Sequence, residues 1–330
     1  MTFNDITSVE NLLLAWEEFL RGKRKRKDVQ EFQINLMDNI LDLHRDLAAK
    51  TYTHGQYEAF NISDPKPRNI HKAIVRDRLL HHAIYRVLYP VYDKTFIAHS
   101  YSCRRHKGTH RALDAFTKMA RQVSNNHTRT VWVLKCDIRR FFASVDQEIL
   151  LHMLSQQIHD SDTLWLLERV IKSFETAQGK GLPLGNLTSQ LLVNIYMNEF
   201  DQWVKRELKA GYYVRYADDF VFFSSDAAKL AEIVRLIVLY LRASLKLELH
   251  PNKVSIATVS SGVDFLGWVH FPHQRTLRTV TKRRMFKTVR GLPEDSPTVR
   301  AYLGLLRHGN TEKILQEVYA LAKEFTEGPF

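Results

Sequence analysis

Three aspartates stand where strand-forming residues end, and carboxylates in such positions can do chemistry. Asp137 closes the apolar run at 130–138, and Asp218 and Asp219 lie between two strand-forming runs in VRYADDFVFFSSD. Neighbouring carboxylates repel one another unless cations neutralise them, and ligands that are all oxygen suit Mg²⁺. Two such ions about 3.5–4 Å apart can activate a hydroxyl and steady a leaving pyrophosphate. The set therefore indicates two-metal nucleotidyl transfer, although an isolated Asp-Asp pair is more often a turn or a helix cap.

The elements that must position these acids follow from hydrophobic periodicity. Apolar spacing of three and four predicts helices at 9–20, 32–47, 76–92 (ended by Pro90), 109–123, 191–208 and 227–245, and largely helical structure over 147–174. Strands are predicted at 130–138, on both sides of the aspartate pair, and at 262–271. Residues 52–68 indicate a loop or hairpin, 179–190 a loop, and the tail from 275 helices interrupted at 291–297. Alternation of helices and strands predicts an α/β or α+β class with a mixed sheet.

The amino-acid composition narrows the classes of binding partner and of cellular compartment. Lysine and arginine number 48 against 36 acids, a formal net charge of +12. This excess favours a polyanionic partner, nucleic acid before an acidic membrane surface, although a merely soluble basic protein is the alternative. Two cysteines, Cys103 and Cys136, support neither a disulfide framework nor a zinc site and fit a reducing compartment. We see no signal peptide and no membrane span, so we expect a cytoplasmic location without membrane attachment.

The ordered motifs resemble those of the reverse transcriptases. YADD at 216–219 is similar to their Y-x-D-D hairpin, DIRRFFASVD at 137–146 to their first aspartate motif, and LPLGNLTSQLLVNIYMNEFD at 182–201 to the loop and helix between them. LKLELHPNKV and VDFLGW resemble the two motifs that follow the hairpin. Upstream, RNIHKAIVRDRLLHHAI and SYSCRRHKGTHRAL resemble the fingers motifs of bacterial enzymes related to group II introns. The resemblance covers about 68–268 and implies an RNA-directed DNA polymerase that binds template RNA, cDNA and dNTPs.

The same resemblance implies an α+β right-hand fold. We expect N-terminal helices and fingers over 1–130, and a palm over 131–271 built on an antiparallel sheet that carries the YADD hairpin. A fingers-type loop and helix would lie around 179–208, and a small basic helical thumb over 272–330.

Residue roles also come from the resemblance. Two Mg²⁺ would be held by Asp137, Asp218 and Asp219 with Ile138 beside them, and Lys253 would be the catalytic acid for pyrophosphate. The nucleotide-binding set would be Arg68, Arg76, Phe142, Leu184, Gly185 and Gln190, with Lys72 as a further candidate for the triphosphate. The primer grip would be Phe265, Leu266, Gly267 and Trp268. The nucleic-acid backbone would contact Lys282, Arg283, Arg284, Lys287 and Arg290, within 275–290, where seven of sixteen positions are basic and none is acidic. Surface charge, core packing and a solvated helix face are the alternatives for the residues other than the aspartates.

The loop motif points to a subtype. Most of the family reads Q-G-x-x-x-S-P, whereas this chain has Leu184, Gly185 and, at the last position, Gln190. This pattern resembles the reverse transcriptases of diversity-generating retroelements, which are bacterial or phage-encoded. The resemblance implies error-prone, adenine-mutagenic cDNA synthesis from a template-repeat RNA in mutagenic retrohoming. It also implies a pentameric, basic accessory variability determinant as partner. A retron, CRISPR-associated or reduced group II intron-type enzyme of ordinary fidelity, a non-catalytic RNA-binding scaffold and a membrane-surface protein remain the alternatives.

Overall fold

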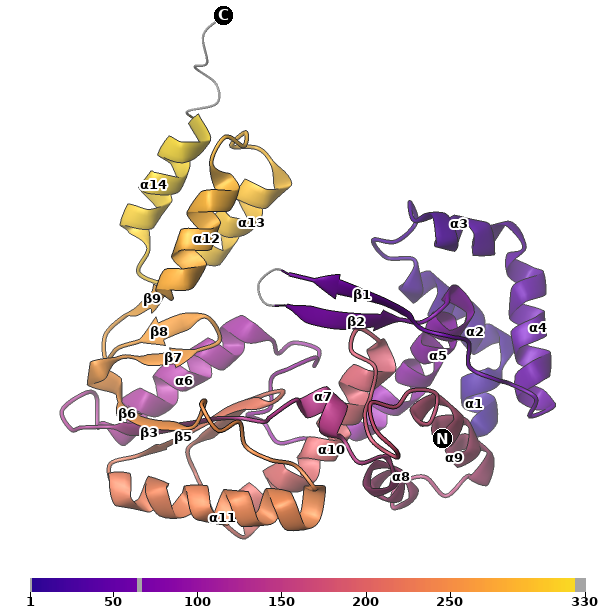
Figure 1. Cartoon of the computed structure of the whole chain (residues 1–330), viewed down its shortest axis with the longest axis horizontal. Coiled ribbons are helices and arrows are strands. Elements are labelled where there is room, and N and C mark those ends of the chain that lie inside the picture. The colour runs from indigo at the N-terminus through magenta and orange to yellow at the C-terminus, as the bar shows by residue number, and fades with distance from the viewer. Residues whose placement is uncertain (1, 64–66, 324–330) are drawn as a thin grey trace, which may run out of the picture. The chain divides into compact units, whose positions relative to one another are not determined.

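The computed structural model describes residues 2–63 and 67–323, and the chain divides into two units (Figure 1). Each unit is assembled from separate stretches of sequence. Unit 1 comprises Met1–Arg104, Ile138–Lys209 and Leu236–Pro251, and unit 2 comprises Arg105–Asp137, Ala210–Arg235 and Asn252–Phe330. The contiguous domain bounds predicted from the sequence therefore stay a prediction.

Unit 1 is mainly helical. It contains α1 (Phe3–Thr7), α2 (Val9–Phe19), α3 (Lys27–Ile34), α4 (Leu36–Ala48), α5 (Val75–Tyr92), α7 (Phe141–Ser144), α8 (Gln147–Ser155), α9 (Ser161–Ile171) and α10 (Leu187–Arg206). The antiparallel pair β1 (Glu58–Ile62) and β2 (Arg68–Lys72) belongs to the same unit. Helices α2 and α10 pack against α5, whose leucines Leu79, Leu80 and Leu88 are fully buried. This burial follows the three-and-four spacing of apolar residues that predicted the helices.

Three helix bounds predicted for unit 1 are wrong in detail. The segment 32–47 is split at Asn35, whose φ of −112° and ψ of 42° are not helical. Helix α5 runs through Pro90 to Tyr92, because a proline near a C-terminus removes only one helical hydrogen bond. Helix α10 begins at Leu187 rather than 191, so Gln190 lies in its first turn. The segment 52–68 does contain a hairpin strand, but 64–66 lie outside the described residues.

Unit 2 is built on two antiparallel sheets. The first has the order β4 (Tyr213–Tyr216), β5 (Asp219–Ser224), β3 (Trp132–Asp137) and β6 (Ser255–Thr258), and the second the order β7 (Val263–Phe265), β8 (Trp268–His270) and β9 (Arg275–Leu277). All described strand pairs are antiparallel, so the expected mixed sheet is wrong. Helix α6 (Thr109–Val123) covers the sheets through Phe116, whose ring lies 4.8 Å from that of Phe223 and 5.6 Å from that of Phe265.

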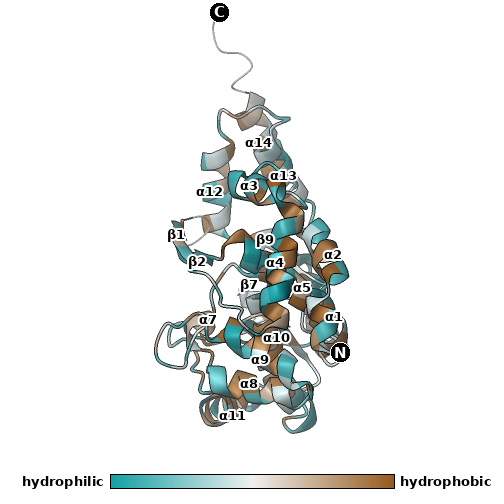
Figure 2. Cartoon of the chain, turned by 90° about the vertical axis from the view of Figure 1, so that its right-hand side faces the viewer, coloured by the Kyte–Doolittle hydropathy of each residue, from teal (hydrophilic) through white to brown (hydrophobic). Residues whose placement is uncertain are grey.

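Three helices complete unit 2: α12 (Thr279–Val289), α13 (Pro297–Leu306) and α14 (Glu312–Lys323). Figure 2 shows α12 largely in the hydrophilic colours, and only Met285 and Val289 of this helix are buried. Helix α11 (Ala227–Leu245) contributes residues to both units. Within the described residues no helix is long and apolar enough to cross a membrane.

The predicted strand at 262–271 is instead the hairpin β7–β8. Its turn is formed by Leu266 and Gly267, whose φ angles are 50° and 87°. Two successive residues with positive φ make the kind of two-residue turn that matches the twist of paired strands. Sequence periodicity did not reveal it because Leu266 is not a residue that usually adopts this conformation.

Candidate active site

The three aspartates are placed by neighbouring strands of the first sheet of unit 2. Asp137 ends β3 and is the cross-strand partner of Asp219, the first residue of β5. Asp218 stands in the β4–β5 turn after Ala217, whose φ is 55°. Residues directly opposite on antiparallel strands have Cβ atoms about 4.5–5.5 Å apart. The sheet register therefore brings together the carboxylates that the sequence placed eighty residues apart.

Two side-chain hydrogen bonds support the turn that carries Asp218. Arg215 is fully buried and donates from Nη1 to the carbonyl of Ala217 at 3.1 Å. Thr109, at the start of α6, donates to the hydroxyl of Tyr216 at 3.1 Å. A buried charge-assisted hydrogen bond inside the turn fixes its backbone more firmly than a solvated one would.

Asp219 has an unusual environment. Its side chain is 19% exposed, its Oδ1 is buried without a hydrogen-bond partner, and its Oδ2 lies 3.8 Å from Nζ of Lys135. Burial raises the pKa of Asp219 to about 7; Lys135 opposes this shift, and the charge of Asp137 adds to it. A carboxyl with that pKa is protonated in a large fraction of molecules at neutral pH, and a divalent cation bound beside it would favour loss of the proton.

Asp137 has a cation beside it already. Nζ of Lys253 donates to Oδ1 of Asp137 at 2.8 Å, and the two side chains are 42% and 16% exposed. The structure thus brings the predicted catalytic acid to the predicted metal ligands. The lysine offsets part of the negative charge that Asp137 and its cross-strand partner Asp219 bring to this edge of the sheet.

A divalent cation fits this donor set by its chemistry. No group of three or more His, Cys, Asp or Glu side chains in the described part of the chain is gathered closely enough to hold a metal. The donors are nevertheless all carboxylate oxygens, and Oδ1 of Asp219 is a buried acceptor without a partner. Ile138 belongs to unit 1, where it forms an antiparallel bridge with Leu249, and its role beside the metals stays a prediction.

The predicted triphosphate residues lie in unit 1. Nη2 of Arg76 bonds Oδ2 of Asp46 at 2.5 Å, and Nζ of Lys72 lies 2.9 Å from Asp28 and 3.2 Å from Glu58. Arg76 and Lys72 line a pocket of about 520 Å³ that also has acidic walls. A triphosphate would have to displace these carboxylates. Arg68 lies exposed at the start of β2.

The loop before α10 is bonded to β2. The amide of His71 donates to the carbonyl of Leu184 at 3.0 Å, and Nδ2 of Asn186 donates to the carbonyl of His71 at 2.8 Å. Gly185 has a φ of 109°, and a Cβ there would stand 2.7 Å from Cγ2 of Ile70. The positive φ and the close approach of the Ile70 side chain therefore both favour glycine at 185.

Phe142 and Phe141 differ in exposure. Phe141 is buried, whereas Phe142 is half-buried, with the two ring centres 5.7 Å apart. The carbonyl of Phe142 accepts a hydrogen bond from the amide of Leu182 at 2.8 Å. The loop at 179–190 therefore joins the segments of Phe142 and of Arg68 within unit 1. Half-exposure leaves the Phe142 ring able to contact a ligand.

The predicted primer grip divides into two kinds of residue. Phe265 and Trp268 are 0% and 1% exposed, so they form core, whereas Leu266 and Gly267 form the turn. On α12, Arg283 and Lys287 are exposed, and Nζ of Lys282 lies 3.6 Å from Glu317. Arg284 is half-buried, and Arg290 follows the last residue of the helix.

Sequence reasoning missed residues that support the site. Lys135 precedes Asp137 by two on the same strand face, a spacing that could have revealed it. Arg215 is a cation inside an apolar strand near the acids, which is also a detectable signal. Asn186 gave no such signal, because its partner His71 is remote in sequence.

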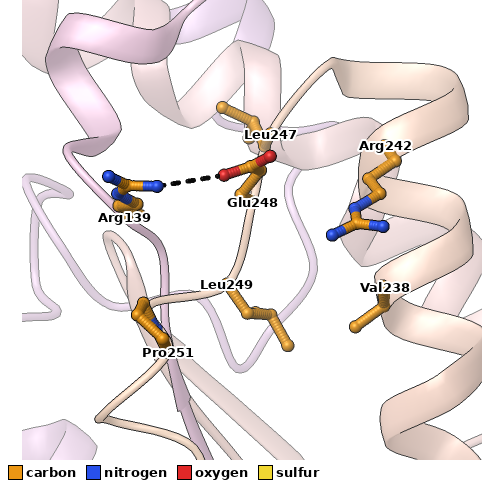
Figure 3. Close-up of a pocket in the computed structure, with 7 residues that line it drawn as sticks. All are labelled: Arg139, Val238, Arg242, Leu247, Glu248, Leu249 and Pro251. Atoms are coloured by element: carbon orange, nitrogen blue, oxygen red, sulfur yellow. Dashed lines mark hydrogen bonds and ion pairs between the residues drawn. The ribbon is translucent and has the colours of Figure 1, made fainter.

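A small pocket of unit 1 is lined by Arg139, from the first aspartate motif, and by residues between Val238 and Pro251 (Figure 3). Its volume is about 200 Å³, and Figure 3 shows the Arg242 side chain beside it and Arg139 paired with Glu248. Nη1 of Arg139 lies 3.4 Å from Oε2 of Glu248, and their main chains are joined by a hydrogen bond of 2.8 Å. None of the predicted site residues lines this pocket.

Comparisons with known proteins agree with this geometry. Residues 63–270 match the family described as "Reverse transcriptase (RNA-dependent DNA polymerase)". Protein YkfC of Escherichia coli is 26% identical over 271 residues, which cover 71% of this chain and 69% of YkfC. The group II intron-encoded protein LtrA of Lactococcus lactis is 26% identical over 134 residues, which cover 39% of this chain and 21% of LtrA.

A solved structure shows the fold. Telomerase from Candida albicans, in complex with a fragment of telomeric RNA, superposes with a TM-score of 0.52 at 12% identity. The superposition covers 83% of this chain and 56% of the telomerase chain, so the chain spans little more than half of that relative. The likeness confirms the predicted α+β fold of the right-hand polymerases. Because the family match extends over more than half of its length, the chain belongs to the reverse transcriptase family of RNA-dependent DNA polymerases.

Proposed function

We propose that this chain extends a DNA 3′-end on an RNA template by nucleotidyl transfer with two Mg²⁺. The observation that supports it most is the cross-strand pair Asp137 and Asp219, with Asp218 in the adjoining turn. Reverse transcriptases use divalent metal ions, and such ions activate the attacking hydroxyl and neutralise charge on the leaving pyrophosphate when bound. The three aspartates would hold them, because their oxygens are hard ligands.

The protein's own groups have distinct parts in this reaction. The sheet fixes Asp137 and Asp219 opposite one another, and Arg215 fixes the turn that carries Asp218. Lys253 stands at Asp137 and carries protons that it can give to the leaving pyrophosphate. Positioning supplies much of the rate in such a transfer, because little other covalent chemistry is left to the protein.

Primer extension tests the proposal. Wild-type protein with an RNA template, an annealed DNA primer, dNTPs and Mg²⁺ should lengthen the primer. The double variant Asp218→Ala/Asp219→Ala should abolish extension yet bind the same RNA within about twofold, because phosphate contacts dominate affinity and lie elsewhere. Measurable extension by the double variant would refute the site, and loss of RNA binding would show that the substitutions had disturbed the fold.

For the subtype, we propose error-prone copying of a template-repeat RNA in a diversity-generating retroelement, with template RNA, cDNA and a basic pentameric accessory protein as partners. Leu184, Gly185 and Gln190 in the loop support it. The side chain of Leu184 is half-buried and has no hydrogen-bonding group. It therefore cannot form the hydrogen bond to the incoming nucleotide that the family's glutamine amide would form. Losing one such contact weakens discrimination by about 1–3 kcal/mol.

Leu184→Gln tests the subtype. The main chain at 184 is held by His71, so this substitution changes the side chain and leaves the loop in place. We expect fewer misincorporations opposite template adenines, measured by sequencing cDNA made by both proteins, with Leu192→Ile in α10 as a control outside the loop. An unchanged error spectrum would refute the explanation of the error rate by the missing contact at position 184.

A second candidate is a retron, CRISPR-associated or reduced group II intron-type reverse transcriptase of ordinary fidelity. The similarity to LtrA, a group II intron-encoded protein, favours it. A low wild-type error rate at every template base would favour this candidate over the mutagenic one.

A further inference from the structure

Arg275, the first residue of β9, is bonded to three separate parts of unit 2. Its Nε donates to the carbonyl of His308, after α13, and its Nη1 lies 3.0 Å from Oδ1 of Asp114 on α6. Its guanidinium also lies 5.9 Å from the ring centre of Trp268 in β8. The side chain is only 16% exposed, so most of its charge is screened by these partners rather than by water.

The main chain repeats this connection. The amide of Asn310 donates to the carbonyl of Arg275 at 3.0 Å, and the amide of Arg275 donates to Oδ1 of Asn310 at 3.3 Å. The chain therefore runs from β9 through α12 and α13 and returns to Arg275, the first residue of that strand. These bonds close a loop that contains the predicted phosphate-binding residues of α12.

The turn after α13 also packs tightly on the primer-grip hairpin. A Cβ at Gly309 would stand 2.1 Å from Cζ3 of Trp268 and 2.9 Å from the carbonyl oxygen of Arg275. His308 stacks on His110 of α6, with ring centres 3.4 Å apart and planes at 17°. The turn after α13 is therefore packed against the hairpin at Gly309 and against α6 at His308.

The opposite side of the hairpin is fastened to α12. The amide of Arg278 donates to the carbonyl of Gly267 at 3.2 Å, and its guanidinium bonds Asp264. The hairpin is thus joined to the helices at two points, through Arg278 and through Arg275.

We propose that Arg275 is a positioning residue that locks the primer-grip hairpin to helices α12 and α13, so that both hold the primer–template duplex together. This inference rests on the proposed polymerase function. Arg275 touches no reacting atom. Its loss should leave nucleotide addition intact and shorten the time that the enzyme stays on the duplex.

Two kinetic readouts separate these effects. Arg275→Ala should add the first nucleotide to a preformed primer–template complex within about twofold of the wild-type rate. Against a heparin trap it should release the duplex about tenfold faster, which corresponds to about 1.4 kcal/mol, and so give shorter products per binding event. Arg275→Lys should recover part of the loss, because lysine keeps the charge but not the forked donors. Arg129→Ala, an exposed arginine elsewhere in unit 2, is the matched control.

Gly309→Ala provides an independent route, because it opens the same joint by steric conflict while Arg275 is kept. It should shorten products in the same way. Unchanged product length in both variants, with unfolding midpoints near the wild type, would overturn the proposal. An equal loss of the first-nucleotide rate and of product length would overturn it as well.

Amide hydrogen exchange keeps the inference separate from the proposed function. Exchange at Arg275 and Asn310 should be faster in the Arg275→Ala protein, and exchange in β3 and β5 should not change. If the wild-type protein extends no primer, the function fails, whereas this measurement still decides whether the joint exists. Unchanged exchange at both amides would refute the joint even in an active polymerase.

Discussion

Gly185→Ala should destabilise the protein through a conflict that can be resolved into two parts. One part is the backbone, since a φ of 109° costs a residue with a side chain about 1–3 kcal/mol. The other is steric, since the new Cβ would stand 2.7 Å from Cγ2 of Ile70. The loop cannot simply move away, because the two hydrogen bonds to His71 hold it against β2. We expect the free energy of unfolding to fall by about 2–4 kcal/mol.

The chain offers a matched control in the same loop. Gly179 has a φ of 66°, and a Cβ there would meet nothing within 4 Å, so Gly179→Ala carries the backbone cost alone. That cost is about 1 kcal/mol, and it is partly offset because alanine has less freedom than glycine in the unfolded chain. The difference between the two variants contains the steric part and the extra backbone cost of the larger φ at 185, and the double-mutant cycle with Ile70 separates the two.

Urea unfolding followed by circular dichroism gives each free energy. In the double variant Ile70→Ala/Gly185→Ala the steric part should disappear, which appears as a coupling of about 1–2 kcal/mol in the double-mutant cycle. If Gly185→Ala and Gly179→Ala were equal within about 0.5 kcal/mol, or if the cycle showed no coupling, the close approach of this loop to β2 would be refuted.

Further predictions concern the selection of deoxynucleotides, the pH dependence of stability and proton transfer to pyrophosphate. Phe142→Val should raise incorporation of ribonucleotides, because a smaller side chain leaves room for a 2′-hydroxyl; unchanged rNTP extension would contradict the gate. Burial, and then Arg275, lowers the pKa of His270 to about 3, so below about pH 6.5 the unfolded chain binds the proton first. Through His270 alone, the free energy of unfolding should therefore fall by about 1.5 kcal/mol from pH 6.5 to 5, and His270→Phe should make the pH dependence measured by urea unfolding shallower by that amount. Lys253→Ala should lower kcat about 10²-fold or more with little change in KM for dNTP, and an unchanged kcat would exclude it as the acid.

Local signals in the sequence were sufficient for several elements. Helix α6 was predicted with its observed bounds, because its apolar stripe is complete and Gly108, with a φ of 98°, precedes it. The β4–β5 hairpin was predicted because strand-forming runs flank a turn of polar residues. Asp137 and Asp219 are cross-strand partners in the sheet and Asp218 lies in the adjoining turn, although their metal-binding role stays a prediction.

Other features depend on partners that are remote in sequence. The start of α10 was hidden because Thr188 and Ser189 are polar yet buried. The pairing of Arg76 with Asp46 could not be read from a pattern, since the two residues come from separate helices. The discontinuous units have no signature in composition or periodicity, because they are defined by contacts alone.

The strand order of the first sheet has a consequence for synthesis. β3 lies between β5 and β6, yet the ribosome makes it before either, since β5 begins at Asp219 and β6 at Ser255. At about 5–20 residues per second, this strand waits on the order of ten seconds for its partners. Its buried positions Val133, Leu134 and Cys136 have no partner strand during that interval, and both of its edges are open to pairing with other chains. The strand that carries Asp137 is therefore an aggregation-prone part of the nascent chain until β5 is made.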